Sequence, residues 1–177
     1  VVCTASSSVR LWTTLARDFT DVAVLNRGFG GSQVRDAVHY ADQIAIHYRP
    51  RAIVIYAGDN DIAAGRTPQQ VLGDVRAFVA RIRRDLPDTP IAYISIKPSP
   101  SRVEQIDAQR TANALVKAKL RRLTNVDYID VSTPMLDATG RPRLELFGPD
   151  RLHMNDAGYA LWCGIVAQHL QRILPRR

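Results

Sequence analysis

The sequence predicts an α/β domain built around a mainly parallel sheet. Along the 177 residues, β-branched apolar runs alternate with segments of helical period, as in chains whose strands are joined by crossover helices. The run from Ala52 to Tyr56 is continuously apolar, which is typical of a central strand covered by helices on both faces. A chain of this length is expected to form one domain over residues 1–177 and to bury roughly 70% of its unfolded surface.

Strands and helices are expected in alternation from the first residue. The runs that suit strands lie at 1–6, 22–27, 51–57, 91–97 and 126–131. Helices are expected at about 8–18, 33–48, 101–123 and 155–174, with a further one from 68 to the proline at 87. That further helix has the clearest start, because Thr67 is a suitable N-cap and Pro68 fits the first helical position.

Two connecting segments stand out between these elements. A glycine-rich turn is expected at 26–31, directly after the second strand. Residues 132–154 are expected to form a long loop, because they carry Pro134, Gly140, Pro142, Gly148 and Pro149. Loops of this length in compact domains are more often functional than decorative.

Composition and charge exclude several classes of protein. With 46% hydrophobic and 23% charged residues and no apolar run near the roughly 18 residues of a membrane span, the chain is expected to be a soluble globular domain. Disordered, collagen-like and membrane-spanning chains are excluded. The net charge of +7 is spread along the chain, and its densest groups lie at 81–84, 117–122 and 176–177. No nucleic-acid motif accompanies them, so we interpret them as solvated helix faces and expect no nucleic-acid partner.

The two cysteines and the chain start give little further information. Cys3 and Cys163 form neither a zinc spacing nor a CxxC motif, and two buried free thiols are expected, although their pairing stays open. The chain begins with Val1-Val2 inside an apparent strand, so we expect an upstream segment to have been removed or left out. Periplasmic, secreted and cytoplasmic locations therefore all remain open, and nothing indicates the oligomeric state.

Chemically useful residues follow the carboxyl ends of the expected strands, where ligands bind in open parallel sheets. The segments are the serines at 6–8, the glycine-rich turn at 26–31, residues 58–61, and residues 150–153 before the last helix. They supply a nucleophile candidate, backbone donors, a carboxamide and an acid–histidine pair. Acyl transfer from an ester needs this set of groups.

Each segment alone also has a structural interpretation. Ser7 suits an N-cap, the glycines suit a tight turn, and residues 59–61 suit a turn without the remaining ligands of a calcium loop. Asp150 and His153 suit an exposed acid and a packed histidine. The glycine spacing is not a dinucleotide fingerprint. The convergence of all four segments on one sheet edge favours the catalytic interpretation.

The same segments resemble the SGNH hydrolases, also called the GDSL esterases, in family order over residues 3–153. Residues 26–31 resemble the second block with its oxyanion glycine, 58–61 match G-x-N-D, and 150–153 match the closing D-x-x-H. The first block departs from the family, because Ala5-Ser6-Ser7 stands where G-D-S is common.

The resemblance implies a role for each site residue. Ser7 is the implied nucleophile, His153 the general base and Asp150 the residue that orients it. The backbone N–H groups of Ser7 and Gly31 and the side chain of Asn60 form the implied oxyanion hole, and no metal or cofactor is expected. Because three serines are adjacent, Ser6 and Ser8 remain alternative nucleophiles.

The resemblance also implies a three-layer α/β/α sandwich with five parallel strands in the flavodoxin-like order 2-1-3-4-5. The implied function is hydrolysis of carboxylic esters, with short acyl chains expected because no long insertion or apolar lid is present. The implied partner is a small-molecule ester. A deacetylase of acetylated carbohydrate and a non-catalytic ligand-binding domain of the same fold remain alternatives. A nucleotide-binding domain would leave Asn60, Asp150 and His153 unexplained.

Overall fold

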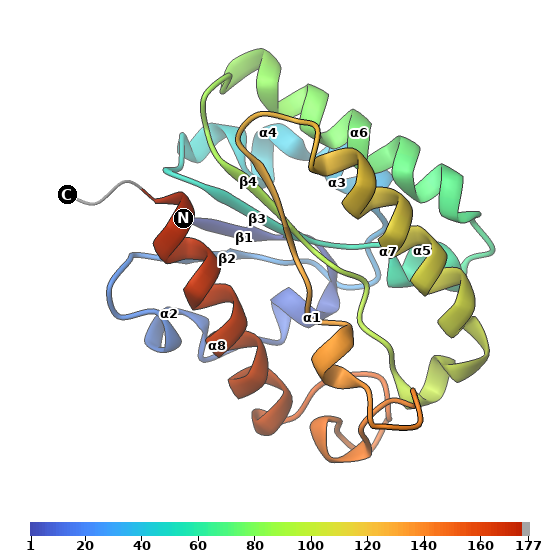
Figure 1. Cartoon of the computed structure of the whole chain (residues 1–177). Coiled ribbons are helices and arrows are strands. Elements are labelled where there is room, and N and C mark those ends of the chain that lie inside the picture. Colours follow the sequence, from blue (N-terminus) through green and yellow to red (C-terminus); the bar gives the residue numbers. More distant parts are fainter. Residues whose placement is uncertain (175–177) are drawn as a thin grey trace.

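The computed structural model describes residues 1–174 and contains one sheet of five parallel strands (Figure 1). The strand order is β2-β1-β3-β4-β5, which confirms the predicted order. The second strand of the sheet is β1, and its residue Cys3 lies between Asn26 of β2 and Val54 of β3. The strand bounds are β1 (Val2–Thr4), β2 (Leu25–Arg27), β3 (Ile53–Tyr56), β4 (Ile91–Ile94) and β5 (Val126–Ile129).

Helices cover both faces of the sheet and confirm the three-layer architecture (Figure 1). One face carries α3 (Val34–His39), α4 (Ala41–Ile44), α6 (Pro68–Asp85) and α7 (Ile106–Leu120). The other carries α1 (Ser6–Arg10), α2 (Leu15–Asp18) and α8 (Asp156–Ile173). The short α5 (Asp59–Ala63) follows β3, and 3-10 turns lie at Ile46–Tyr48, Pro100–Gln105, Thr133–Met135 and Leu144–Leu146.

The core consists of two apolar layers on either side of the sheet. In β3, Ile53 and Ile55 pack into the layer under α6, whereas Val54 and Tyr56 pack into the layer under α8. This alternation is the period of two of a pleated strand, and because both faces are covered, every residue of β3 is buried. The sheet therefore gives a rigid edge from which the loops of the site project.

Three predicted helices are interrupted in the structure. The helix expected at 8–18 divides into α1 and α2, because the Asn26 side chain occupies the carbonyl groups of Val9 and Trp12, at 2.7 and 3.3 Å, near the break. The helix expected at 33–48 divides where Tyr40 and Ala45 leave α-helical dihedral angles.

The helix expected at 101–123 begins instead as a 3-10 turn, in which Arg102 has non-helical angles of φ −125° and ψ 29°. The turn expected at 59–61 is instead the first turn of α5. In contrast, α6 begins where predicted: the Thr67 hydroxyl accepts a hydrogen bond from Gln70 N, and the Gln70 side chain accepts one from Thr67 N. The segment 132–154 is a long loop with only short 3-10 turns, as predicted.

Strands β1, β3, β4 and β5 end earlier than predicted, at the edge that carries the site, whereas β2 ends at Arg27 as predicted and begins three residues later. After β1, Ala5 and Ser6 have positive φ angles of 63° and 56°, and after β3, Gly58 has a φ of 124°. These angles are incompatible with a continuing strand. The residues that were expected to end the strands therefore build the turns into α1 and α5.

Both cysteines are free, but only Cys3 is buried, so the prediction of two buried thiols is wrong for the partly exposed Cys163. Within the first basic group, Arg81 pairs with Asp42, and Arg83 donates to the carbonyl groups of the loop that precedes β5. Arg176 and Arg177 lie outside the described residues. None of the helices within residues 1–174 is both long and apolar enough to cross a membrane.

Candidate active site

A strained turn leads from β1 into α1 and carries Ser7. Ala5, with φ 63° and ψ 159°, occupies a region that is essentially limited to glycine, and Ser6 is left-handed. The Ser32 hydroxyl braces this turn, because it accepts a hydrogen bond from Ser6 N at 2.6 Å. Ala5 thus adopts a glycine-type conformation at the position where the first sequence block departs from glycine. Ser7 follows directly, in the first turn of α1.

A continuous chain of hydrogen bonds joins Ser7, His153 and Asp150. Ser7 Oγ lies 3.0 Å from His153 Nε2, and His153 Nδ1 lies 2.6 Å from Asp150 Oδ2. The other carboxylate oxygen of Asp150 accepts hydrogen bonds from the backbone N–H groups of Leu152 and His153, at 3.0 and 2.9 Å. The bond from Leu152 N, followed by the one from the His153 side chain, lowers the pKa of Asp150 from 3.8 to about 2. Asp150 is therefore ionised at neutral pH, and its carboxylate can accept a hydrogen bond from the N–H of His153 Nδ1.

The neighbouring serines lack this connection. Ser6 and Ser8 are buried, and within residues 1–174 their hydroxyl groups have no hydrogen-bond partner. Among the three adjacent serines, the geometry therefore favours Ser7 as the nucleophile, and its role stays a prediction.

The glycine-rich turn approaches α1 closely. A Cβ atom on Gly28 would lie 2.2 Å from the backbone nitrogen of Arg10, so only glycine fits there. The Asn26 side chain accepts a hydrogen bond from Gly28 N at 2.9 Å while it donates to Val9 O. Gly31, at the end of the turn, has a φ of 71°. A positive φ, which glycine readily adopts in a tight turn, is thus present at Gly31 but absent at Gly28 and Gly30, and at Gly28 the close approach to α1 is the reason for glycine.

The first turn of α5 lies against the end of the glycine-rich turn. Asn60 Nδ2 donates to Ser32 O at 3.1 Å, and Asn60 Oδ1 accepts from Arg102 Nη2 at 3.0 Å. Asp61 is fully buried, and both of its carboxylate oxygens lie 3.1 Å from Val34 N, the first residue of α3. Asn60 therefore lies beside Ser32, the residue that follows Gly31, and the role of Asn60 and Gly31 in an oxyanion hole stays a prediction.

Buried charges lie beneath these residues. Lys97 Nζ donates to Leu152 O at 2.9 Å and lies 3.8 Å from Asp59 Oδ2, and Arg102 Nη1 lies 3.4 Å from the same oxygen. Burial lowers the pKa of Lys97. Burial also raises the pKa of Asp61, from 3.8 to about 6.

Several of these supporting residues were missed by sequence reasoning. Lys97 and Arg102 lie in the segment that follows the carboxyl end of β4, at the edge of the sheet where Ser7 follows β1. The same rule that found Ser7 would have found Lys97. Asp61 was included in the G-x-N-D block, but its bond to Val34 N depends on contacts that the sequence does not display.

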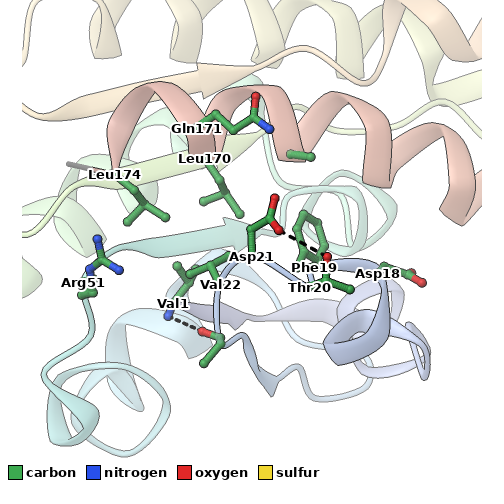
Figure 2. A pocket seen from close by; sticks show the side chains of 12 residues that line it. Val1, Asp18, Phe19, Thr20, Asp21, Val22, Arg51, Leu170, Gln171 and Leu174 are labelled. Carbon is green, nitrogen blue, oxygen red and sulfur yellow. Dashed lines mark hydrogen bonds between the residues drawn. The ribbon is translucent and has the colours of Figure 1, made fainter. Parts of the chain in front are cut away.

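A separate cavity of about 650 Å³ lies at the opposite end of the sheet, beside the start of β1 (Figure 2). Its lining side chains come from the segment between α2 and β2, from the end of α8, and from the residues that precede β1 and β3. They include Val1, Phe19, Asp21, Arg51, Leu170 and Leu174. None of the predicted site residues lines it.

The chemistry of the described residues gives no metal site of its own. No group of three or more histidine, cysteine, aspartate or glutamate side chains within residues 1–174 is arranged to hold a metal ion. The expectation that the site works without metal or cofactor stays a prediction.

Comparison with known proteins places the chain among lipases and acylhydrolases. The model of the GDSL-like lipase/acylhydrolase family matches residues 2–161. The search of curated proteins returned no match.

Solved structures with the same fold are similar over nearly the whole chain. A predicted acylhydrolase from Bacteroides fragilis has a TM-score of 0.87 and 19% identity and covers 98% of this chain and 87% of its own. A GDSL-like lipase from Bacteroides thetaiotaomicron has a TM-score of 0.82 and 18% identity, with 98% and 88% covered. A carbohydrate esterase of family 3 from Talaromyces cellulolyticus has a TM-score of 0.74 and 14% identity, with 98% and 96% covered.

Proposed function

The chain belongs to the GDSL-like lipase/acylhydrolase family, and from this premise we propose that it hydrolyses carboxylic esters through an acyl-enzyme on Ser7. The observation that carries the proposal is the hydrogen-bonded chain from Ser7 Oγ through His153 to Asp150. It supplies a nucleophile, a base and a carboxylate that orients the base, which are the groups that acyl transfer needs.

The proposed first half-reaction forms the acyl-enzyme. Neutral His153 carries its proton on Nδ1, toward ionised Asp150, and presents a lone pair at Nε2. Nε2 takes the hydroxyl proton as Ser7 Oγ forms a bond to the ester carbonyl carbon. The imidazolium then returns that proton to the alkoxide as the carbonyl carbon–oxygen bond to the alcohol breaks.

Water completes the cycle in the proposed second half-reaction. His153 takes a proton from the water as its oxygen bonds to the acyl carbon, and the bond to Ser7 Oγ then breaks with return of the proton to Ser7. The free acid leaves. In both halves the negative oxygen of the tetrahedral intermediate accepts hydrogen bonds from the N–H groups of Ser7 and Gly31 and from Asn60 Nδ2.

We propose short acyl chains as the preferred substrates. Most large apolar side chains of the loop 132–154 are buried in the core layer under α8, namely Met135, Leu146, Phe147 and Met154, whereas Leu144 is exposed. The burial of these four supports the choice. They are not free to line a groove for a long chain. An acetylated sugar, which is an ester of a carbohydrate, belongs among the test substrates, because one solved structure with the same fold is named a carbohydrate esterase. The proposal includes one domain over residues 1–177 and no nucleic-acid partner.

The test is hydrolysis of p-nitrophenyl acetate, p-nitrophenyl octanoate and an acetylated sugar by the purified protein. Ser7→Ala and His153→Ala should each lower kcat by about a thousandfold or more, because the nucleophile and base act as a unit. Ser8→Ala removes a buried hydroxyl that has no hydrogen-bond partner among the described residues 1–174; it is the matched control and should retain turnover. A fluorophosphonate should add covalently to the peptide that contains Ser7.

The alternatives give different results. Full activity in Ser7→Ala would remove Ser7 as the nucleophile. A folded wild-type protein that hydrolyses none of the esters and is not labelled would favour a non-catalytic ligand-binding domain. A higher kcat/KM for the octanoate than for the acetate would contradict the preference for short acyl chains.

A further inference from the structure

The side chain of Asn60 can support an oxyanion in only one of its two orientations. A carboxamide has a donor end, Nδ2, and an acceptor end, Oδ1. Rotation of the group by half a turn would exchange them and place a carbonyl oxygen where the negative oxygen develops. An oxyanion hole that uses Asn60 therefore needs something that fixes which end faces the substrate.

Two neighbours with opposite hydrogen-bonding character fix this orientation. The carbonyl oxygen of Ser32 can only accept, and it lies 3.1 Å from Nδ2. The guanidinium of Arg102 can only donate, and its Nη2 lies 3.0 Å from Oδ1. In the rotated carboxamide, Oδ1 would lie against the carbonyl oxygen of Ser32, and Nδ2 would lie against the N–H group of Arg102. Neither pair of atoms can form a hydrogen bond. In the observed orientation, the second hydrogen of Nδ2 is left for a substrate oxygen.

Arg102 is itself held in place by buried charge. Its Nη1 lies 3.4 Å from Asp59 Oδ2, and its side chain is only 17% exposed. The Asp59 side chain is 4% exposed and also lies 3.8 Å from Lys97 Nζ. The guanidinium is thus fixed by a carboxylate that is shared between two cations, unlike a surface arginine with many accessible rotamers.

The same ion cluster contacts the segment that carries the base. Lys97 Nζ donates to the carbonyl oxygen of Leu152, which lies between Asp150 and His153 in the chain. The backbone N–H of Ser101, the residue before Arg102, donates to Arg151 O at 3.0 Å. The cluster therefore connects the Asp–His turn to the residues around Asn60.

We propose that Arg102 is a positioning residue that holds the Asn60 carboxamide with Nδ2 toward the oxyanion. The inference rests on the proposed function, because it concerns the same reaction. Arg102 acts through Asn60 and not on the substrate, so its removal should lower kcat and leave KM nearly unchanged. In a protein that already lacks the Asn60 carboxamide, removal of the Arg102 guanidinium should lower kcat no further.

The experiment is a double-mutant cycle between Asn60→Ala and Arg102→Met with p-nitrophenyl acetate. Asn60→Ala should lower kcat by about 10²- to 10³-fold. Arg102→Met should lower it by about tenfold, because loss of the hydrogen bond to Oδ1 lets the carboxamide both rotate and shift from the position in which Nδ2 meets the oxyanion. In the Asn60→Ala background, Arg102→Met should cause no further loss. Arg102→Lys should recover part of the rate. Arg110→Met, on the exposed side of α7, is the matched control and should retain wild-type kcat.

A second readout does not depend on turnover. In the nitrogen-15 NMR spectrum, the carboxamide signals of Asn60 are identified by their loss in Asn60→Ala. Arg102→Met should shift or broaden these signals, and Arg110→Met should leave them in place. This readout separates the present inference from the proposed function, because it applies equally to a protein that hydrolyses no ester.

Two results would overturn the inference. One is an equal loss of kcat from Arg102→Met in both backgrounds, which would indicate a direct action on the substrate. The other is an Asn60 signal that Arg102→Met leaves unchanged, which would mean that Arg102 does not set the orientation. Thermal unfolding of each variant verifies that the compared proteins are folded at the assay temperature.

Discussion

Replacement of Asp61 by asparagine should remove a loss of stability that develops as the pH rises. The Asp61 carboxylate is fully buried, accepts a hydrogen bond from Val34 N, and lies 3.8 Å from Arg66 Nε. Burial is the largest influence on it and raises its pKa from 3.8 to about 6. At a pH between 3.8 and about 6, the Asp61 carboxyl keeps its proton in the folded protein but has released it in the unfolded chain. Asp61 therefore favours folding fully below pH 4, and this contribution is lost as the pH rises through 6.

The magnitude follows from the two pKa values. The difference between 3.8 and about 6 corresponds to ~3 kcal/mol of unfolding free energy, of which roughly 2 kcal/mol develops between pH 4 and pH 7. Asparagine does not titrate. The free energy of unfolding of Asp61→Asn, minus that of the wild type, should therefore increase by roughly 2 kcal/mol over this pH range.

Urea unfolding at pH 4, 5, 6 and 7 measures this difference. Comparison of the two proteins at each pH cancels the titration of other groups, including Asp150, whose pKa is lowered and whose effect has the opposite sign. Asp88→Asn, which changes an exposed carboxylate, is the control and should show a nearly constant difference. A difference for Asp61→Asn that is equally constant from pH 4 to pH 7 would refute the reasoning.

Two further predictions concern the reaction and the glycine-rich turn. Hydrogen bonds hold the pKa of Asp150 at about 2, so its carboxylate stays ionised between pH 7 and pH 4, and its protonation should not lower kcat/KM in this range. A plot of log kcat/KM against pH with a slope of two between pH 7 and pH 4 would contradict the assignment of Asp150. Gly28→Ala should lower the free energy of unfolding by roughly 1–3 kcal/mol, because its Cβ would meet the backbone of Arg10. Gly73 lies on α6 with open space around it, so Gly73→Ala should instead raise the free energy of unfolding by roughly 0.5–1 kcal/mol. Chemical denaturation measures both variants, and equal effects would be evidence against the close approach of Gly28 to Arg10.

The sequence was sufficient where a local signal decides the structure. The start of α6 depends on Thr67, Pro68 and Gln70, which are adjacent in the chain and cap the helix without help from elsewhere. The buried strand β3 was predictable from its continuous apolar run. The strand order was predictable from the family resemblance, because the sheet topology is common to its members.

The interruptions of helices were not predictable, because they depend on contacts between distant residues. The Asn26 side chain competes for the carbonyl groups of Val9 and Trp12, and only the folded chain brings it there. For the candidate site, the motif positions were predictable but their supports were not. Arg102 meets Asn60 across 42 positions of sequence, and the sequence contains no periodic signal for that contact.

The two hydrogen bonds of the Ser–His–Asp chain differ greatly in sequence separation. Asp150 and His153 are three residues apart, so their bond needs only one turn of chain, whereas Ser7 and His153 are 146 residues apart. Bringing Ser7 to His153 closes this long loop and requires both ends of the chain to be in place on the sheet. Closure of this loop carries most of the conformational entropy cost of forming the Ser–His–Asp chain. During refolding, the acid–histidine pair can therefore form early, while the proposed hydrolysis needs Ser7 beside His153 and should return only with global folding. Recovered activity would then report on completion of the whole domain.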